Sequence, residues 1–154
     1  MRKRSAYRPR PALNNNLLYI LTGNLPVTAA AETVTRVKVA NHGAMDSLVK
    51  GKGTGTDIVA LGHMLTTAEA LAKHNLGRDW LPELTEARDA LNRLTMRSGN
   101  FVMKADEIKA LNLAIEVHDA QLENCTIKQL EDAIIAAKNA IRHNHAVKEL
   151  LALS

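Results

Sequence analysis

Residues 105–124 read ADEIKALNLAIEVHDAQLEN, and this stretch decides the fold class. Its mostly apolar positions recur every three or four residues, at Ile108, Leu111, Ile115, His118 and Leu122. This spacing puts them on one face of an α-helix, which is stable in water only when that face packs against other helices. Asp106 and Glu107 in the first turn favour the positive end of the helix dipole. We therefore predict a helix over 105–124.

The same spacing recurs along the rest of the chain. It predicts a short helix over 15–22 and longer ones over about 31–49, 56–74, 79–97 and 126–151. The predicted inward positions are Val34, Val37, Asn41, Ala44 and Leu48, then Ile58, Leu61, Leu65, Ala68 and Ala72, then Trp80, Leu84, Ala87, Leu91 and Leu94, and finally Leu130, Ile134, Ala137 and Ile141. The β-branched residues that alternate over 33–39 leave a strand as the alternative for that segment.

Helix-start and helix-stop signals support these boundaries. Thr54 with Asp57, and Thr126 with Gln129, fit the capping-box pattern, and Pro82 is tolerated in a first turn. Short loops join the long helices, so consecutive helices should be antiparallel neighbours. With 154 residues and only 3% aromatic side chains, the chain is expected to form one all-α domain over residues 14–154. That domain is predicted to be an antiparallel helical bundle of about five to six helices.

Positive charge is concentrated at the start of the chain. Residues 1–10 contain five basic side chains and no acid, whereas the remaining residues contain fifteen basic and sixteen acidic side chains. Pro9 and Pro11 disfavour a helix here, and the segment has little apolar surface to offset the entropy of ordering. Residues 1–13 are therefore predicted to be a disordered basic arm.

This arm is the strongest functional signal. Its candidate contact residues are Arg2, Lys3, Arg4, Tyr7, Arg8 and Arg10. Clustered positive charge can neutralise phosphates, and Tyr7 could stack on an unpaired base, so nucleic acid is one expected partner. An acidic protein surface and a merely solubilising role are the alternatives.

Composition also suggests a compartment. Cys125 is the only cysteine and cannot form an internal disulfide, which favours a reducing compartment. No apolar run reaches the ~18 residues of a membrane span, and no secretory signal follows the first charged residues. We expect a bacterial cytoplasm as the location and no contact with a membrane.

Motifs that could carry chemistry are weak. Residues 67–81 could be a helix-turn-helix, but the following helix would bring four acids and one base to the phosphates. His118-Asp119 is similar to the paired ligands of HD-type metal-dependent phosphohydrolases, yet a histidine on an apolar stripe is more often a hydrogen-bonded core residue. Gly51–Thr56 has the composition, but not the order, of a phosphate loop. We predict no catalytic residue, no metal and no cofactor.

Three segments carry a resemblance to a known family. They are MRKRSAYRPRP at 1–11, the Asn41-His42 pair, and ALNLAIEVHDAQLE at 110–123. Together they resemble a family of small proteins from tailed phages and prophages of Gram-negative bacteria, for which no activity is established. The resemblance implies expression in an infected or lysogenic bacterium.

The expected function is therefore non-enzymatic. The leading hypothesis is a phage-type accessory or regulatory protein that binds a host or phage macromolecule, with possible self-association of the Ala- and Leu-rich bundle. The alternatives are a nucleic-acid-binding protein that uses the arm, a structural component of the virion, and an HD-type phosphohydrolase.

Overall fold

The computed structural model describes residues 25–26, 30–97 and 101–152, with side chains of the last helix described as far as His145. Within these ranges the chain is helical. The elements are α2 (Ala31–Val49), α3 (Gly55–Lys73), the 3-10 helix η2 (Arg78–Trp80), α4 (Leu81–Thr95), α5 (Ala105–Asn124) and α6 (Ile127–Ala152). The all-α prediction is confirmed, and residues 31–49 are a helix and not a strand. The predicted arm over 1–13 and the short helix over 15–22 lie outside the described residues.

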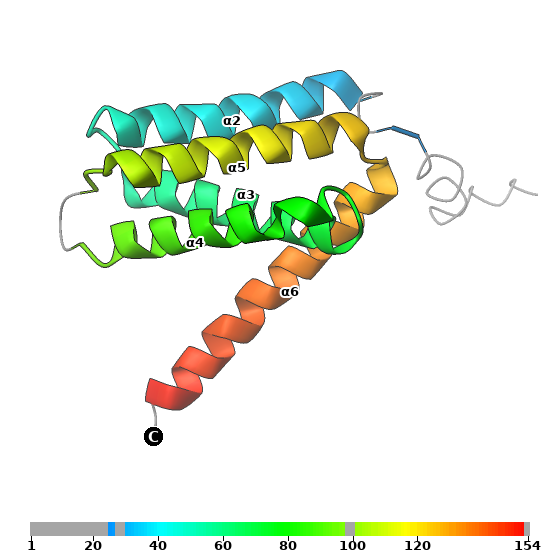
Figure 1. The fold of residues 1–154 in the computed structure, drawn as a ribbon. Coiled ribbons are helices and arrows are strands. Elements are labelled where there is room, and N and C mark those ends of the chain that lie inside the picture. Colours follow the sequence, from blue (N-terminus) through cyan, green and yellow to red (C-terminus); the bar gives the residue numbers. More distant parts are fainter. Residues whose placement is uncertain (1–24, 27–29, 98–100, 153–154) are drawn as a thin grey trace, which may run out of the picture.

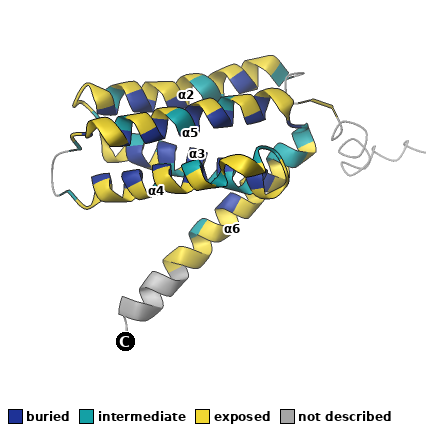
Figure 2. Cartoon of the chain, viewed as in Figure 1, coloured by how far each residue is buried: buried dark blue, intermediate teal, exposed yellow. Residues whose placement is uncertain are grey.

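Helices α2 to α5 form a four-helix bundle in which each helix runs antiparallel to the one before it (Figure 1). Each packs against the helix before it, and α5 also packs against α2. Helix α3 is the central element because it contacts α2, α4, α5 and α6. The buried residues lie mainly along the sides of these helices that are turned toward one another (Figure 2). The prediction of antiparallel neighbours therefore holds for these four helices.

Large and small apolar residues share the core. Leu61, Leu65 and Ala68 on α3 are fully buried, as are Ala87 on α4 and Ala114 on α5. Alanine at such positions lets helix axes approach closely, while leucine fills the space between them. The core therefore needs almost no aromatic side chains.

The predicted capping signals position two helix starts. The Thr54 N–H donates to Asp57 Oδ2 at 2.8 Å at the start of α3. At the start of α6, the Thr126 N–H donates to Gln129 Oε1 at 2.9 Å and the Gln129 N–H donates to Thr126 Oγ1 at 3.2 Å. Each pair satisfies backbone donors that the first turn of a helix leaves free.

Helix α6 departs from the predicted arrangement. It packs against α3, the central helix, and its C-terminal half projects beyond the four-helix body (Figure 1). Cys125 has an extended backbone, and the Ile127 N–H donates to the Leu25 carbonyl at 3.0 Å. This extended turn redirects the chain, so α6 does not fold back along α5.

Two inward assignments are wrong, one because α6 leaves the bundle and one because a 3-10 helix precedes α4. Ile134 is 37% exposed, whereas the buried residues among the described side chains of α6 are Ala133 and Ala137. Trp80 is 44% exposed because the chain forms η2 before α4 begins, which moves its indole off the apolar face of α4. The other predicted inward residues of α3 and α4 are buried, as expected.

Candidate functional site

The residues predicted to contact a partner cannot be placed. All six lie outside the described residues: Arg2, Lys3, Arg4, Tyr7, Arg8 and Arg10. The described chain begins at Leu25 and Pro26, and Pro26 forms an isolated bridge with Thr126. The segment that carries the basic residues therefore joins the body beside the start of α6.

A buried polar pair links α5 to the end of α3. Gln121 is 4% exposed, and its Nε2 donates to the Ala68 carbonyl at 3.0 Å and to the Leu76 carbonyl at 2.8 Å. These two bonds fix the direction of the amide, so its Oε1 lies toward His118 Nδ1, 3.4 Å away. An oxygen in this position accepts, and Nδ1 must therefore carry the proton.

His118 is a neutral core histidine. Its side chain is buried, and burial lowers the pKa of its imidazole, although the Gln121 hydrogen bond and the Asp119 charge act in the opposite direction. With the proton on Nδ1, the Nε2 atom of a neutral ring is an acceptor. The reading of His118 as a hydrogen-bonded core residue is confirmed.

His118 and Asp119 have different partners. Asp119 Oδ2 lies 2.8 Å from Nε2 of His42 on α2, and next to this pair Lys38 Nζ lies 2.6 Å from Glu123 Oε1. The Glu123 hydrogen bond raises the pKa of Lys38. Nowhere in the part of the chain that the structure describes do three His, Cys, Asp or Glu side chains form a group that could hold a metal ion. His118 therefore belongs to the core, whereas Asp119 belongs to the contact between α2 and α5.

A cavity of about 290 Å³ lies where α2, α3, α5 and α6 meet. Its lining is mainly apolar, with polar contributions from Asn41, His63, Thr67 and His118. Asn41 is 6% exposed, and its Nδ2 is buried without a hydrogen-bond partner. We call this space the α2/α3/α5/α6 cavity.

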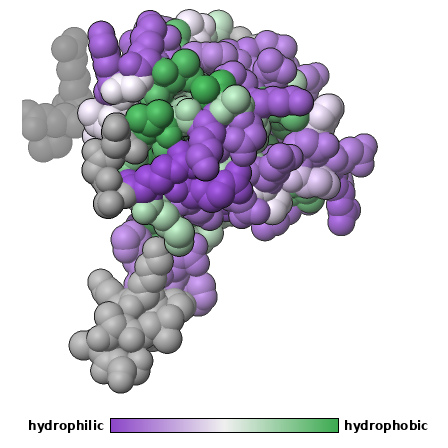
Figure 3. Space-filling model, turned by 60° about the vertical axis from the view of Figure 1, so that its left-hand side comes forward, coloured by the Kyte–Doolittle hydropathy of each residue, from purple (hydrophilic) through white to green (hydrophobic). Residues whose placement is uncertain are grey.

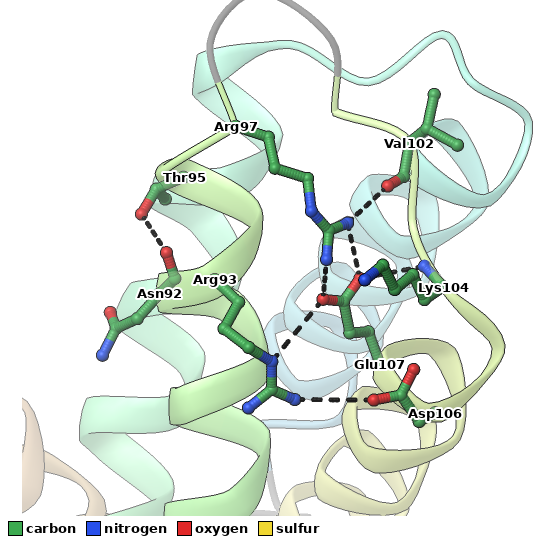
Figure 4. A network of polar contacts seen from close by, with 8 residues as sticks. All are labelled: Asn92, Arg93, Thr95, Arg97, Val102, Lys104, Asp106 and Glu107. Atoms are coloured by element: carbon green, nitrogen blue, oxygen red, sulfur yellow. Dashed lines mark hydrogen bonds and ion pairs between the residues drawn. The ribbon is translucent and has the colours of Figure 1, made fainter.

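The strongest polar network lies at the other end of the bundle and was missed from the sequence. Glu107 is fully buried at the start of α5, where it accepts hydrogen bonds from both terminal nitrogens of Arg97 and from the Lys104 N–H (Figure 4). Arg93 Nε lies 3.7 Å from the same carboxylate, and Arg97 also donates to the Val102 carbonyl. The sequence signal that could have predicted part of this network is a glutamate at the third position of a helix, which often accepts a hydrogen bond from the backbone N–H at the helix start.

The electrostatics of this network favour the charged carboxylate. Burial by itself raises the pKa of Glu107, but the hydrogen bonds from Arg97 and from the Lys104 amide, together with the arginine charges, lower it below its ordinary value. The network joins the end of α4 to the start of α5 across the intervening turn. Its contacts are all internal, so it has a structural role.

The geometry of α4 argues against a helix-turn-helix. Leu84, Ala87 and Leu91 are buried in the bundle. Arg88, the basic residue that the motif would offer to phosphates, donates to Glu69 at 2.6 Å and to Thr66 at 2.9 Å. The apolar face of α4 therefore packs in the core, and Arg88 in the middle of this helix is held by α3.

Comparisons with known proteins add no relative. No protein-family model matches the chain, and no match is found among curated proteins or solved structures. None of the helices in the described ranges is long and apolar enough to cross a lipid bilayer.

Proposed function

We propose that the protein is a non-enzymatic binding protein that uses the basic residues of its first ten positions to hold nucleic acid. One observation carries this proposal: residues 1–10 contain five basic side chains and no acid, while the remainder of the chain is almost balanced. A dense cationic segment neutralises phosphates and releases counterions, and it needs no further geometry to do so.

The charges of the helical bundle support this contrast between a basic N-terminal segment and a nearly balanced remainder. Basic side chains of the bundle are repeatedly matched by acids of the bundle, as in Lys38 with Glu123, Arg88 with Glu69 and Arg97 with Glu107. Hydrophilic side chains cover most of the face in Figure 3, and apolar ones gather mainly in one area. The body therefore suits a scaffold better than a broad phosphate-binding surface.

The resemblance to small phage proteins gives this proposal a setting. Binding would take place in an infected or lysogenic bacterium, with host or phage nucleic acid as the partner. Affinity purification from infected cells, with and without nuclease, tests the setting. Loss of the captured material after nuclease treatment supports nucleic acid, whereas a retained host or phage protein points to an acidic protein partner. Recovery of the protein in purified particles would indicate a virion component instead.

Salt dependence is the direct test of the mechanism. If all five basic residues contact duplex phosphates, the logarithm of affinity should fall with the logarithm of salt concentration with a slope of about −4.5, or about −3.5 for a single strand. Fluorescence anisotropy with labelled single-stranded and duplex DNA and RNA measures this slope. An unmeasurable affinity at low salt for every nucleic acid would contradict the proposal.

Two variants make the test specific to the arm. The first replaces its basic residues by alanine: Arg2, Lys3, Arg4, Arg8 and Arg10. The matched control replaces five exposed basic residues of the body: Lys52, Lys109, Lys128, Lys138 and Arg142. The first variant should lose affinity and flatten the slope, and the control should do neither. Tyr7→Ala should weaken single-strand binding by about tenfold, because stacking contributes roughly 1–3 kcal/mol.

A further inference from the structure

The α2/α3/α5/α6 cavity opens to solvent and has an apolar wall. Ala40 on α2 and Ile134 on α6 line it and are exposed, whereas Met64 and Leu122 line it from the buried side. Between them, Leu130 on α6 is half-buried. Because apolar side chains here still contact water, a further apolar group laid over them would be stabilised. Such a group would also return Ile134 to the apolar environment that its position in the sequence pattern predicts.

The lining of the cavity selects against a charged occupant. Among the described residues that surround it there is no Asp, Glu, Lys or Arg. A charged group would lose hydration there without gaining an ionic partner, which is costly. The basic residues of positions 1–10 are therefore unsuited to the cavity, and an uncharged apolar segment suits it.

The chain contains such a segment outside the described residues. Residues 11–24 read PALNNNLLYILTGN and include no Asp, Glu, Lys or Arg, and positions 17–21 are an uninterrupted apolar and aromatic run. The sequence predicts a helix over 15–22, and a helix of this length is not stable in water unless it packs against something. Leu17 and Leu21 are four residues apart, so they would share one face of that helix.

The chain enters the described structure close to the cavity. The Leu25 carbonyl accepts from the Ile127 N–H at 3.0 Å, and Figure 1 shows this point beside the junction of α5 and α6. Leu130 and Ile134, which line the cavity, lie about 5 and 10 Å further along the axis of α6. The chain from Leu25 back to Leu21 spans up to about 14 Å when extended. The cavity is therefore within reach of the apolar run.

We propose that residues 15–22 of this chain dock in the α2/α3/α5/α6 cavity. Leu17 and Leu21 enter the cavity and contact Leu130 and Ile134 of α6. A cavity of roughly 150 Å³ holds benzene, so a cavity of about 290 Å³ takes about two leucine side chains. The docked segment extends the core between α2 and α6, and the basic residues 1–10 then start from the edge of the cavity. This docking requires no nucleic acid.

Nuclear Overhauser effects between methyl groups test the contact in the full-length wild type. Protein with ¹³C-labelled Leu and Ile methyl groups should show effects between Leu21 or Leu17 and Ile134. A second sample mixes, after unfolding and refolding together, protein labelled only at Leu with protein labelled only at Ile. Effects between Leu and Ile can arise in this mixture only between two copies, so those from the segment to Ile134 should disappear.

Variants test the contribution of the contact to stability. The double change Leu17→Ser and Leu21→Ser should lower the midpoint of urea unfolding by about 1 M, because two apolar side chains lose their burial. The matched control changes two exposed valines of the bundle, Val39→Ser and Val59→Ser, which are 65% and 55% exposed. It should change the midpoint by less than about 0.3 M.

A third variant tests whether the two sides of the contact act together. Ile134→Ser should lower the midpoint in the wild type and should lower it less in the Leu17→Ser/Leu21→Ser background, because the partner side chains are already gone.

Four results would overturn the proposal. They are the absence of effects between the segment and Ile134 in the wild type, and an unchanged midpoint in the Leu17→Ser/Leu21→Ser variant. Equal shifts for Ile134→Ser in both backgrounds would do the same. Effects that persist in the mixed sample would show instead that the segment of a second copy occupies the cavity.

Discussion

The buried Glu107 network makes a quantitative prediction for stability. Glu107 Oε2 lies 2.9 Å from Arg97 Nη1 and 2.9 Å from the Lys104 amide, and its side chain is wholly buried. The informative changes are Arg97→Met, Glu107→Leu and the double variant. Each single change removes one partner of the ion pair, and the double change removes both charges together.

The two single variants should differ in cost. Arg97→Met leaves a carboxylate that is wholly buried, with the Lys104 amide as its main remaining partner. Removing one partner of a buried pair costs about 3–5 kcal/mol, so the loss should be about 3–4 kcal/mol. Glu107→Leu leaves Arg97, whose side chain is 28% exposed and can regain water. The expected loss there is about 2 kcal/mol.

The double variant should cost less than the sum of the two. No uncompensated charge remains in it, so a loss of about 2–3 kcal/mol and a coupling energy of about 2–4 kcal/mol are expected. Urea unfolding followed by circular dichroism measures all four free energies of unfolding. Additive losses, or single losses below about 0.5 kcal/mol, would refute the assignment of this network as a buried ion pair.

The network also predicts a pH dependence. The pKa of Glu107 in the folded state is below its ordinary value of 4.5, so the folded state binds this proton less readily than the unfolded state. Its contribution is complete above the unfolded pKa and is lost as the pH falls through the folded pKa. The difference in unfolding free energy between wild type and Glu107→Leu should therefore shrink below about pH 4.5. A constant difference down to the acid limit of folding would contradict this.

Three further outcomes follow from burial. Burial lowers the pKa of His118 below its ordinary 6.5, so the unfolded state binds that proton more readily than the folded state. The free energy of unfolding should therefore fall as the pH drops below 6.5. His118→Gln should reduce this pH dependence in urea unfolding, whereas the same change at exposed His143 should not. Cys125 is buried and its pKa is raised by burial, so an aromatic disulfide reagent should react slowly with the native protein and rapidly in urea. Leu65→Ala, fully buried, should cost about 2–5 kcal/mol in urea, whereas Ile135→Ala, 57% exposed, should cost less than about 0.5 kcal/mol.

Local signals predicted the helices well because they act within a few residues. The helices over 31–49 and 105–124 have the bounds of α2 and α5, and the starts of α3 and α6 follow their capping residues. Periodicity also predicted burial correctly where a neighbouring helix runs alongside, as for Leu61 and Leu65 on α3 and Leu94 on α4.

Long-range placement could not be predicted in the same way. The departure of α6 depends on the extended turn at Cys125 and on a contact with Leu25, a hundred residues away in the chain. The short loop between them predicted that α6 would pack antiparallel to α5. Ile134 was assigned to the core for that reason, and the assignment was wrong. The cavity is a product of this placement, so no sequence pattern indicated it, although Asn41 and His118 were both expected on inward faces.

The contact of Leu25 with Ile127 fixes the point at which the preceding residues join the bundle. The residues that precede Leu25 begin their path at the corner where α5 gives way to α6, and twenty-four residues span at most about 80 Å when fully extended. Any molecule held by the first ten positions stays within that radius of the bundle. Its local concentration near the bundle surface is then far above that in a dilute solution. A second contact on the helices is therefore mostly occupied, whenever the first ten positions hold that molecule, if its dissociation constant lies below this local concentration.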